Sequence, residues 1–101
     1  MFKLNFVFSK TGMMKYISHL DLMRTFTRAL RRAEIPVKIS EGFNPHPKLS
    51  IKRALKLGLE SENEEACVGL VRLFKPEDFK EKMQVQLPEG ITIKSASYSN
   101  N

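Results

Sequence analysis

The sequence predicts an α+β fold in which two helices cover one face of an antiparallel sheet. In the first nine residues every second side chain from Phe2 to Phe8 is a large apolar one, and mostly polar side chains stand between them, which is the pattern of a half-buried strand. Residues 18–34 repeat apolar side chains at helical spacing, and residues 76–86 begin with proline and two acids, as helices often do. The order of strand, helix, strands, helix and strand is that of a ferredoxin-like sandwich. At this length we expect residues 1–101 to form a single domain of that type.

The N-terminal strand is predicted over Met1–Ser9 and the first helix over Ser18 to about Glu34, with a turn at residues 10–15 between them. Ser18 followed three residues later by Asp21 is a capping signal for the start of that helix. One face of the helix is apolar and the opposite face is basic. The apolar face contains Leu22, Phe26, Ala29, Leu30 and Ala33, and the basic face contains Arg24, Arg28, Arg31 and Arg32.

Pro36 ends the first helix, because proline cannot continue a helical turn. The segments after it are predicted from apolar alternation and from turn residues. They are a short strand at Pro36–Ile39, a strand at Leu49–Leu59 with a bulge near Arg53 and Ala54, an acidic turn at Glu60–Glu65, a strand at Ala66–Phe74, the second helix at Pro76–Gln86, a turn at residues 87–90 and a last strand at Ile91–Ala96.

Positive charge is concentrated in the first part of the chain. Residues 1–58 contain twelve Lys and Arg against three acids, whereas residues 59–101 contain five against eight. The net charge of the whole chain is +6 at pH 7. This asymmetry is typical of proteins that bind polyanions, and nucleic acid is the usual partner of that class.

The four arginines of the first helix are the first candidate binding feature. Guanidinium groups on one solvent face could hold successive phosphates, each with a forked set of donors. The alternative is a solvated helix face on which Arg24 pairs with Asp21 and the alkyl stems cover the edge of the core. The sequence leaves both interpretations open.

The segment EGFNPHPKLS, residues 41–50, is the second candidate. Its two prolines push Asn44 and His46 towards extended conformations, so we expect a stiff arm. The arm displays Phe43, Asn44, His46 and Lys48, which suit stacking on a base and contact with its edge or phosphate. The alternative is a connector in which Phe43 fills the core and His46 bonds locally.

Little in the sequence indicates catalysis or a metal. Cys67 is the only cysteine, which excludes an internal disulfide and favours a reducing cytoplasm, and we expect a small buried residue there. His19 and Asp21 diverge on a helix and no zinc spacing is present, so we expect no metal and no cofactor. Glu62, Glu64 and Glu65 are interpreted as a solvated acidic turn. No apolar run could cross a bilayer, so we expect a cytoplasmic protein without a membrane partner.

Several motifs in this order resemble one bacterial family. They are Ser18-His19-Leu20-Asp21 with Arg24, then Arg28 and Arg31-Arg32-Ala33, then Gly42-Phe43-Asn44-Pro45-His46-Pro47, then Gly58 with Glu60-Ser61 and Glu64, and Leu87-Pro88-Glu89-Gly90-Ile91. Together they resemble the radical-SAM-linked protein family, a domain of unknown function fused to, or encoded beside, cobalamin-binding radical SAM proteins. The resemblance implies that the chain is the N-terminal half of a longer architecture, with a radical SAM protein as partner and an association with RNA processing.

Three hypotheses about function follow. The preferred one is a noncatalytic accessory module that binds structured RNA beside a radical SAM partner, through Arg24, Arg28, Arg31, Arg32, Phe43, Asn44, His46 and Lys48. The second is a protein-interaction module that docks the same surface on the radical SAM enzyme. The third is an enzyme whose acid and base groups are His19, Asp21 and His46, which requires these side chains to converge in a pocket. The chain cannot itself be a radical SAM enzyme, since the cluster of such an enzyme needs three cysteines.

Overall fold

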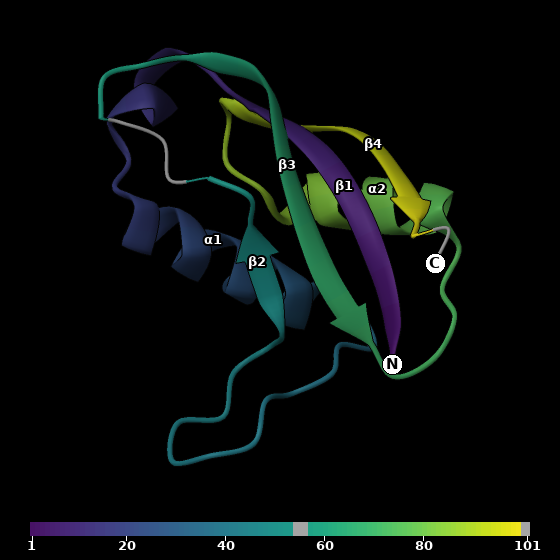
Figure 1. The fold of residues 1–101 in the computed structure, drawn as a ribbon. Helices are drawn as coiled ribbons and strands as arrows, with labels where there is room; N and C mark the ends of the chain where they lie inside the picture. The colour runs from purple at the N-terminus through teal and green to yellow at the C-terminus, as the bar shows by residue number, and fades with distance from the viewer. Residues whose placement is uncertain (54–56, 100–101) are drawn as a thin grey trace.

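The computed structural model describes residues 1–53 and 57–99, and it confirms the predicted α+β fold. The four strands form one antiparallel sheet in the order β2-β3-β1-β4, so the central strands are β1 and β3. Both long helices lie on the same face of this sheet, as a ferredoxin-like sandwich requires (Figure 1). The elements are β1 (Phe2–Lys10), a 3-10 helix η1 (Gly12–Tyr16), α1 (His19–Arg32), β2 (Leu49–Ile51), β3 (Ser61–Leu70), α2 (Pro76–Gln86) and β4 (Ile91–Tyr98).

The core lies between the sheet and the helices. The alternation of β1 turns Leu4, Phe6 and Phe8 towards the helices, and all three are buried. The rings of Phe6 and Phe8 meet Phe26 of α1 at centroid distances of 5.5 and 4.9 Å, both edge to face. Phe79 of α2 contacts Phe6 at 5.3 Å. One aromatic cluster therefore fixes both helices to the central strand.

Helix α1 begins and ends with recognisable caps. The Ser18 hydroxyl accepts a hydrogen bond from the Asp21 N–H at 3.1 Å, which confirms the predicted N-cap. At the other end Glu34 has a φ of 56°, its N–H donates to the Arg31 carbonyl, and the Ile35 N–H donates to the Leu30 carbonyl. This is a Schellman ending with glutamate where glycine is usual. It directs the chain away from α1 into the segment that carries the two prolines.

The structure corrects the predicted strands around residues 36–59. Pro36–Ile39 forms no strand and makes only isolated bridges, Val37 with Leu70 and Ile39 with Pro47. The strand predicted over Leu49–Leu59 ends at Ile51. Leu57 and Leu59 are more than half exposed, so they do not pack on the core as alternating strand residues would. Gly58 between them turns the chain with a φ of 84°. The predicted bulge near Ala54 lies outside the described residues.

The other boundaries change in a similar way. The predicted acidic turn is wrong, because β3 begins at Ser61 and Glu64 points to the core side opposite Phe8. Strand β3 ends at Leu70, before the exposed Val71 and Leu73, and β4 continues two residues beyond the predicted Ala96. Within the predicted turn at residues 10–15 the chain forms η1. In the described part of the chain, no helix is both long and apolar enough to cross a membrane.

Candidate nucleic-acid interface

The four arginines of α1 lie on its solvent face. Arg24 contacts Asp21 at 3.6 Å, but both side chains are more than half exposed, so this pair contributes little to stability. Within residues 1–53 and 57–99, no salt bridge involves Arg28, Arg31 or Arg32. These three guanidiniums are therefore available to an external anion.

The segment that carries the two prolines folds back as a narrow projecting loop, which we call the aromatic loop (residues 40–47). At its base Ile39 bridges Pro47, and the Ser40 N–H donates to the His46 carbonyl at 2.8 Å. The His46 N–H in turn donates to the Ser40 hydroxyl at 3.2 Å. The loop extends beyond the rest of the ribbon between α1 and β2 (Figure 1). The predicted stiff arm is thus held by backbone pairing as well as by its prolines.

Phe43 lies at the tip of the aromatic loop with its side chain fully exposed, at 104% relative exposure. It does not fill the core, so the connector interpretation fails for this residue. The neighbouring Gly42 has a φ of 131°, a backbone conformation that residues other than glycine rarely adopt. Pro47, at the base, is buried, and His46 Nδ1 lies 3.1 Å from the Pro47 carbonyl, to which it donates as Nδ1–H.

A groove separates α1 from the base of the aromatic loop, and we call it the α1–loop groove. Its volume is about 430 Å³. One wall carries three of the predicted arginines, and the other carries His46 and Pro47. No acidic residue is among the described lining residues, which are Leu20, Met23, Arg24, Thr27, Arg28, Arg31, His46 and Pro47. The groove therefore combines positive charge with an apolar floor.

The predicted binding residues separate into four places. Arg24, Arg28, Arg31 and His46 meet in the α1–loop groove, while Phe43 and Asn44 lie at the exposed tip of the aromatic loop. Arg32 lies on another side of α1, where it lines a hollow of about 270 Å³ with Arg28 and with Gln86, Leu87 and Pro88. Lys48 lies with Met1, Lys3 and Cys67 in a hollow on the open face of the sheet.

The three residues proposed for catalysis do not share this groove. Neither His19 nor Asp21 lines it, and Asp21 contacts Arg24 instead. Among residues 1–53 and 57–99, no group of three or more His, Cys, Asp or Glu side chains is placed to hold a metal ion. The described residues therefore offer no converging acid and base pair around His46.

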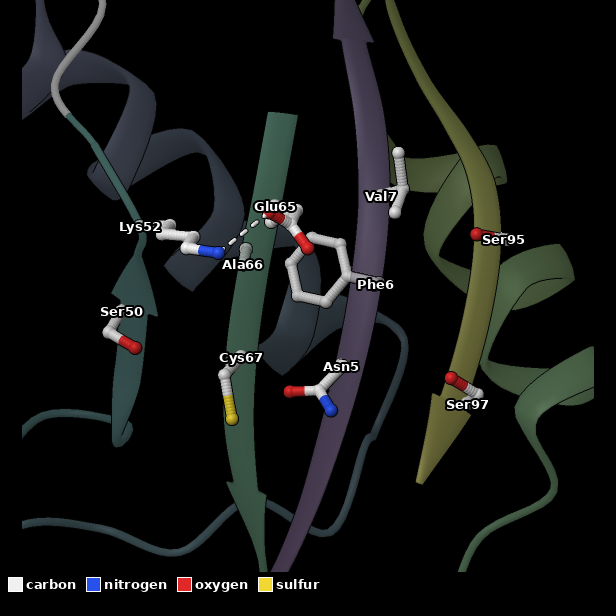
Figure 2. Close-up of a pocket in the computed structure, with 10 residues that line it drawn as sticks. All are labelled: Asn5, Phe6, Val7, Ser50, Lys52, Glu65, Ala66, Cys67, Ser95 and Ser97. Carbon is white, nitrogen blue, oxygen red and sulfur yellow. Dashed lines mark hydrogen bonds and ion pairs between the residues drawn. The ribbon is translucent and has the colours of Figure 1, made fainter. Parts of the chain in front are cut away.

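The face of the sheet opposite the helices is uncovered and polar. Figure 2 shows its side chains, with the helices behind the strands. A hollow of about 460 Å³ lies over Asn5, Val7, Ser50, Cys67, Ser95 and Ser97. Lys52 contacts Glu65 at 3.1 Å on this face (Figure 2). Lys94 of β4 contacts Glu62 of β3 at 3.2 Å. No exposed aromatic side chain lines the described hollow, so it lacks the rings on which sheet-based RNA-binding domains stack bases.

Cys67 lies half-buried on this open face. Burial raises the pKa of the Cys67 thiol, and the nearby charge of Lys3 opposes that rise. The thiol therefore stays protonated near neutral pH and is a poor nucleophile. The sequence predicted a buried side chain here, and the structure corrects this, because Cys67 on the open face is only half-buried.

Sequence reasoning missed a buried charged cluster at the far end of β1 and β3. Glu64 and Lys10 are each 1% exposed on the core side of the sheet. Arg53 donates to both Glu64 oxygens, with Nε–Oε1 at 3.1 Å and Nη2–Oε2 at 2.9 Å, and the Ser61 hydroxyl also donates to Glu64. Glu64 is in phase with the buried Ala66, Val68 and Leu70. That phase is the signal that could have revealed the cluster.

The charged groups of this cluster shift one another's pKa values. The hydrogen bonds from Arg53 lower the pKa of Glu64, with help from Ser61 and Lys10 and against the effect of burial. Burial lowers the pKa of Lys10, and the charge of Glu64 opposes that change. The same carboxylate raises the pKa of Arg53. The cluster thus joins β3 to the segment after β2 through the hydrogen bonds between Arg53 and Glu64, and the charge of Lys10 on β1 adds to it.

Fold and site define the class of protein as a ferredoxin-like α+β domain with a basic groove beside a projecting aromatic loop. Residues 3–101 match a family described as an uncharacterized protein conserved in bacteria (DUF2344). Because the match covers nearly the whole chain, the protein belongs to this family. A comparison with curated proteins found no match.

Proposed function

We propose that the protein is a noncatalytic module that binds structured RNA through the α1–loop groove. The observation that carries this proposal is the pairing of Arg24, Arg28 and Arg31 across one groove with a loop that presents an exposed aromatic ring. Arg28 and Arg31 have no acidic partner among the described residues, and Arg24 has only its exposed contact with Asp21. Such guanidiniums favour phosphate, because each can donate two parallel hydrogen bonds to it. The positive field of residues 1–58 would attract the polyanion over longer distances.

The groove is a better candidate than the open sheet face for this purpose. On the sheet, Lys52 and Lys94 each have a carboxylate within 3.2 Å. Lys3 and Lys48 line a hollow there without such a contact among the described residues, but lysine lacks the forked donors with which arginine binds phosphate. In the groove, Arg28 and Arg31 have no such described partner. A cation already paired with a carboxylate has to give up that contact before it binds a phosphate, so the unpaired arginines of the groove bind phosphate at lower cost.

The test is the salt dependence of RNA binding. Replacing Arg28 and Arg31 by alanine removes two phosphate contacts, so RNA affinity near 0.15 M salt should fall roughly tenfold to a hundredfold. The slope of log affinity against log salt should become shallower by about 1.5. Binding of a structured hairpin RNA, followed by fluorescence anisotropy at several salt concentrations, measures both quantities.

The control removes the same charge elsewhere. The double variant Arg72→Ala/Lys80→Ala changes two exposed cations outside the groove and should bind nearly as the parent does. Equal losses in the two double variants would indicate a non-specific effect of net charge and would refute the groove as the binding site. Binding that does not change with salt would refute RNA recognition through phosphates.

The resemblance stated above supports a second part of the proposal, namely that the module works beside a radical SAM protein. A second candidate function is that this protein, and not RNA, occupies the groove. The exposed Leu20 and the half-buried Met23 on the groove floor favour it, since apolar side chains are more typical of a protein interface. Co-purification of a radical SAM protein that survives nuclease treatment but is lost in the Arg28→Ala/Arg31→Ala variant would favour protein docking.

A further inference from the structure

The position of Phe43 is unusual for a phenylalanine in a well-tied loop. Its ring is fully exposed, although the loop that carries it is closed by the Ser40–His46 and Lys38–Lys48 backbone pairs. A loop that only connects α1 to β2 needs neither this closure nor an apolar tip. The backbone at the base of the loop is tied in advance, so less conformational entropy is lost when the tip contacts a partner.

The charge of the aromatic loop limits what its tip can recognise. Residues 40–47 contain one acid, Glu41, and neither lysine nor arginine. The arginines of the site face His46 and Pro47 at the base of the loop, not its tip. The tip therefore gains nothing from a phosphate and must bind through the face of its ring and through the Asn44 amide beside it.

In RNA, the surface that suits such a tip is the flat face of a base. Within a helix both faces of each base are covered by neighbours, so only an unpaired or terminal base offers a free one. Asn44 can donate and accept hydrogen bonds at the edge of a base that stacks on Phe43. The arginines would at the same time hold the backbone on one side of that base.

From these observations we infer that the α1–loop groove and the aromatic loop together recognise an unpaired nucleotide that adjoins a backbone held by Arg24, Arg28 and Arg31. The target class is RNA with a bulge, a loop or a junction between paired and single-stranded segments. This inference rests on the proposed function, since it presumes that the groove binds RNA. It adds that Phe43 selects among RNAs of equal charge.

The experiment compares two RNA duplexes of the same sequence without hairpin loops, one fully paired and one with a single bulged 2-aminopurine in its middle. The parent protein should bind the bulged RNA at least about tenfold more tightly, in line with the stacking of one base on an aromatic side chain. It should also quench the 2-aminopurine fluorescence. Phe43→Ala should lose this preference and the quenching while keeping the salt slope, and Phe43→Trp should keep both.

The outcomes separate this inference from the proposed function. The Arg28→Ala/Arg31→Ala variant should bind both RNAs more weakly with the preference for the bulge retained. Equal binding of the two RNAs by the parent would overturn the inference and leave RNA binding intact, whereas binding of neither would overturn both. If Phe43→Ala abolishes nuclease-resistant capture of a protein and leaves RNA selection unchanged, the ring serves a protein pocket and the inference is wrong. Because Phe43 is fully exposed, its variants should unfold at the same temperature as the parent.

Discussion

The α1–loop groove and the cluster around Glu64 use the same types of charged side chain for opposite purposes. In the cluster, Lys10 and Glu64 are buried, and Arg53 donates two hydrogen bonds to the carboxylate. In the groove, Arg28 and Arg31 are exposed and have no carboxylate partner among the described residues. The difference separates cations that stabilise the fold through a carboxylate from cations that are available to bind a partner. A count of positive charge along the sequence does not distinguish the two.

The largest effect on stability is expected from breaking the cluster. Glu64→Ala leaves the buried Lys10 without its carboxylate and exposes the core end of β3 to an unpaired charge. The change also removes the charge-assisted hydrogen bonds from Arg53, whose side chain is mostly exposed, so the free energy of unfolding should fall by about 2 kcal/mol. Urea unfolding at pH 7 measures the loss.

The comparison also predicts what this change leaves alone. Glu64 does not line the α1–loop groove, so a Glu64→Ala protein that is still folded should keep the salt slope of RNA binding. A shallower slope would mean that the cluster also contributes to the groove, and the proposed division of roles would then be wrong.

A second effect is the pH dependence of the same cluster. The folded state lowers the pKa of Glu64, chiefly through the hydrogen bonds from Arg53. The stability that Glu64 contributes is therefore complete above its unfolded pKa of about 4 and is lost as the pH falls through the lower folded value. Urea unfolding of the parent and of Glu64→Gln from pH 7 down to pH 3 measures this loss. The difference between their free energies of unfolding should first stay constant and then shrink as the pH falls. A difference that grows on acidification would contradict this origin.

The sequence was sufficient to predict the elements whose signals are local. The alternation of Met1–Ser9 and the Ser18–Asp21 cap predicted β1 and the start of α1, because each depends only on neighbours along the chain. The alternation of side chains around Leu49 could also have placed Lys48. Leu49 packs on the core, so its neighbour Lys48 has to face the opposite side of the sheet, away from the groove.

Other features depend on contacts between distant segments. Glu64 looks like part of a solvated acidic run until Arg53 and Lys10 are brought to it by the pairing of β3 with β1. The groove likewise exists only because Pro47 is folded back against α1 after a loop whose path no local signal specifies. The arginines and the stiff arm could be identified as candidates from the sequence. The sequence did not show that they line one groove, or that Arg32 and Lys48 lie outside it.

The smallest expected effect tests the end of α1, where the chain turns towards the aromatic loop. Glu34 adopts a φ of 56° at a position where glycine avoids the steric cost, so Glu34→Gly should raise the free energy of unfolding by about 1 kcal/mol or less. The same change removes a negative charge three residues after Arg31, which should strengthen RNA binding slightly, by roughly twofold at low salt. Thermal unfolding and RNA titration of the same samples measure the two effects.

A matched variant separates the backbone effect from the charge effect. Glu34→Gln removes the charge and keeps a side chain that is strained in the left-handed region, so it should share the gain in RNA affinity without the gain in stability. Equal stability of the glycine and glutamine variants would show that the left-handed conformation at residue 34 carries no cost. Unchanged affinity in both would place the bound phosphates beyond the reach of Glu34, towards the Arg24 end of the groove.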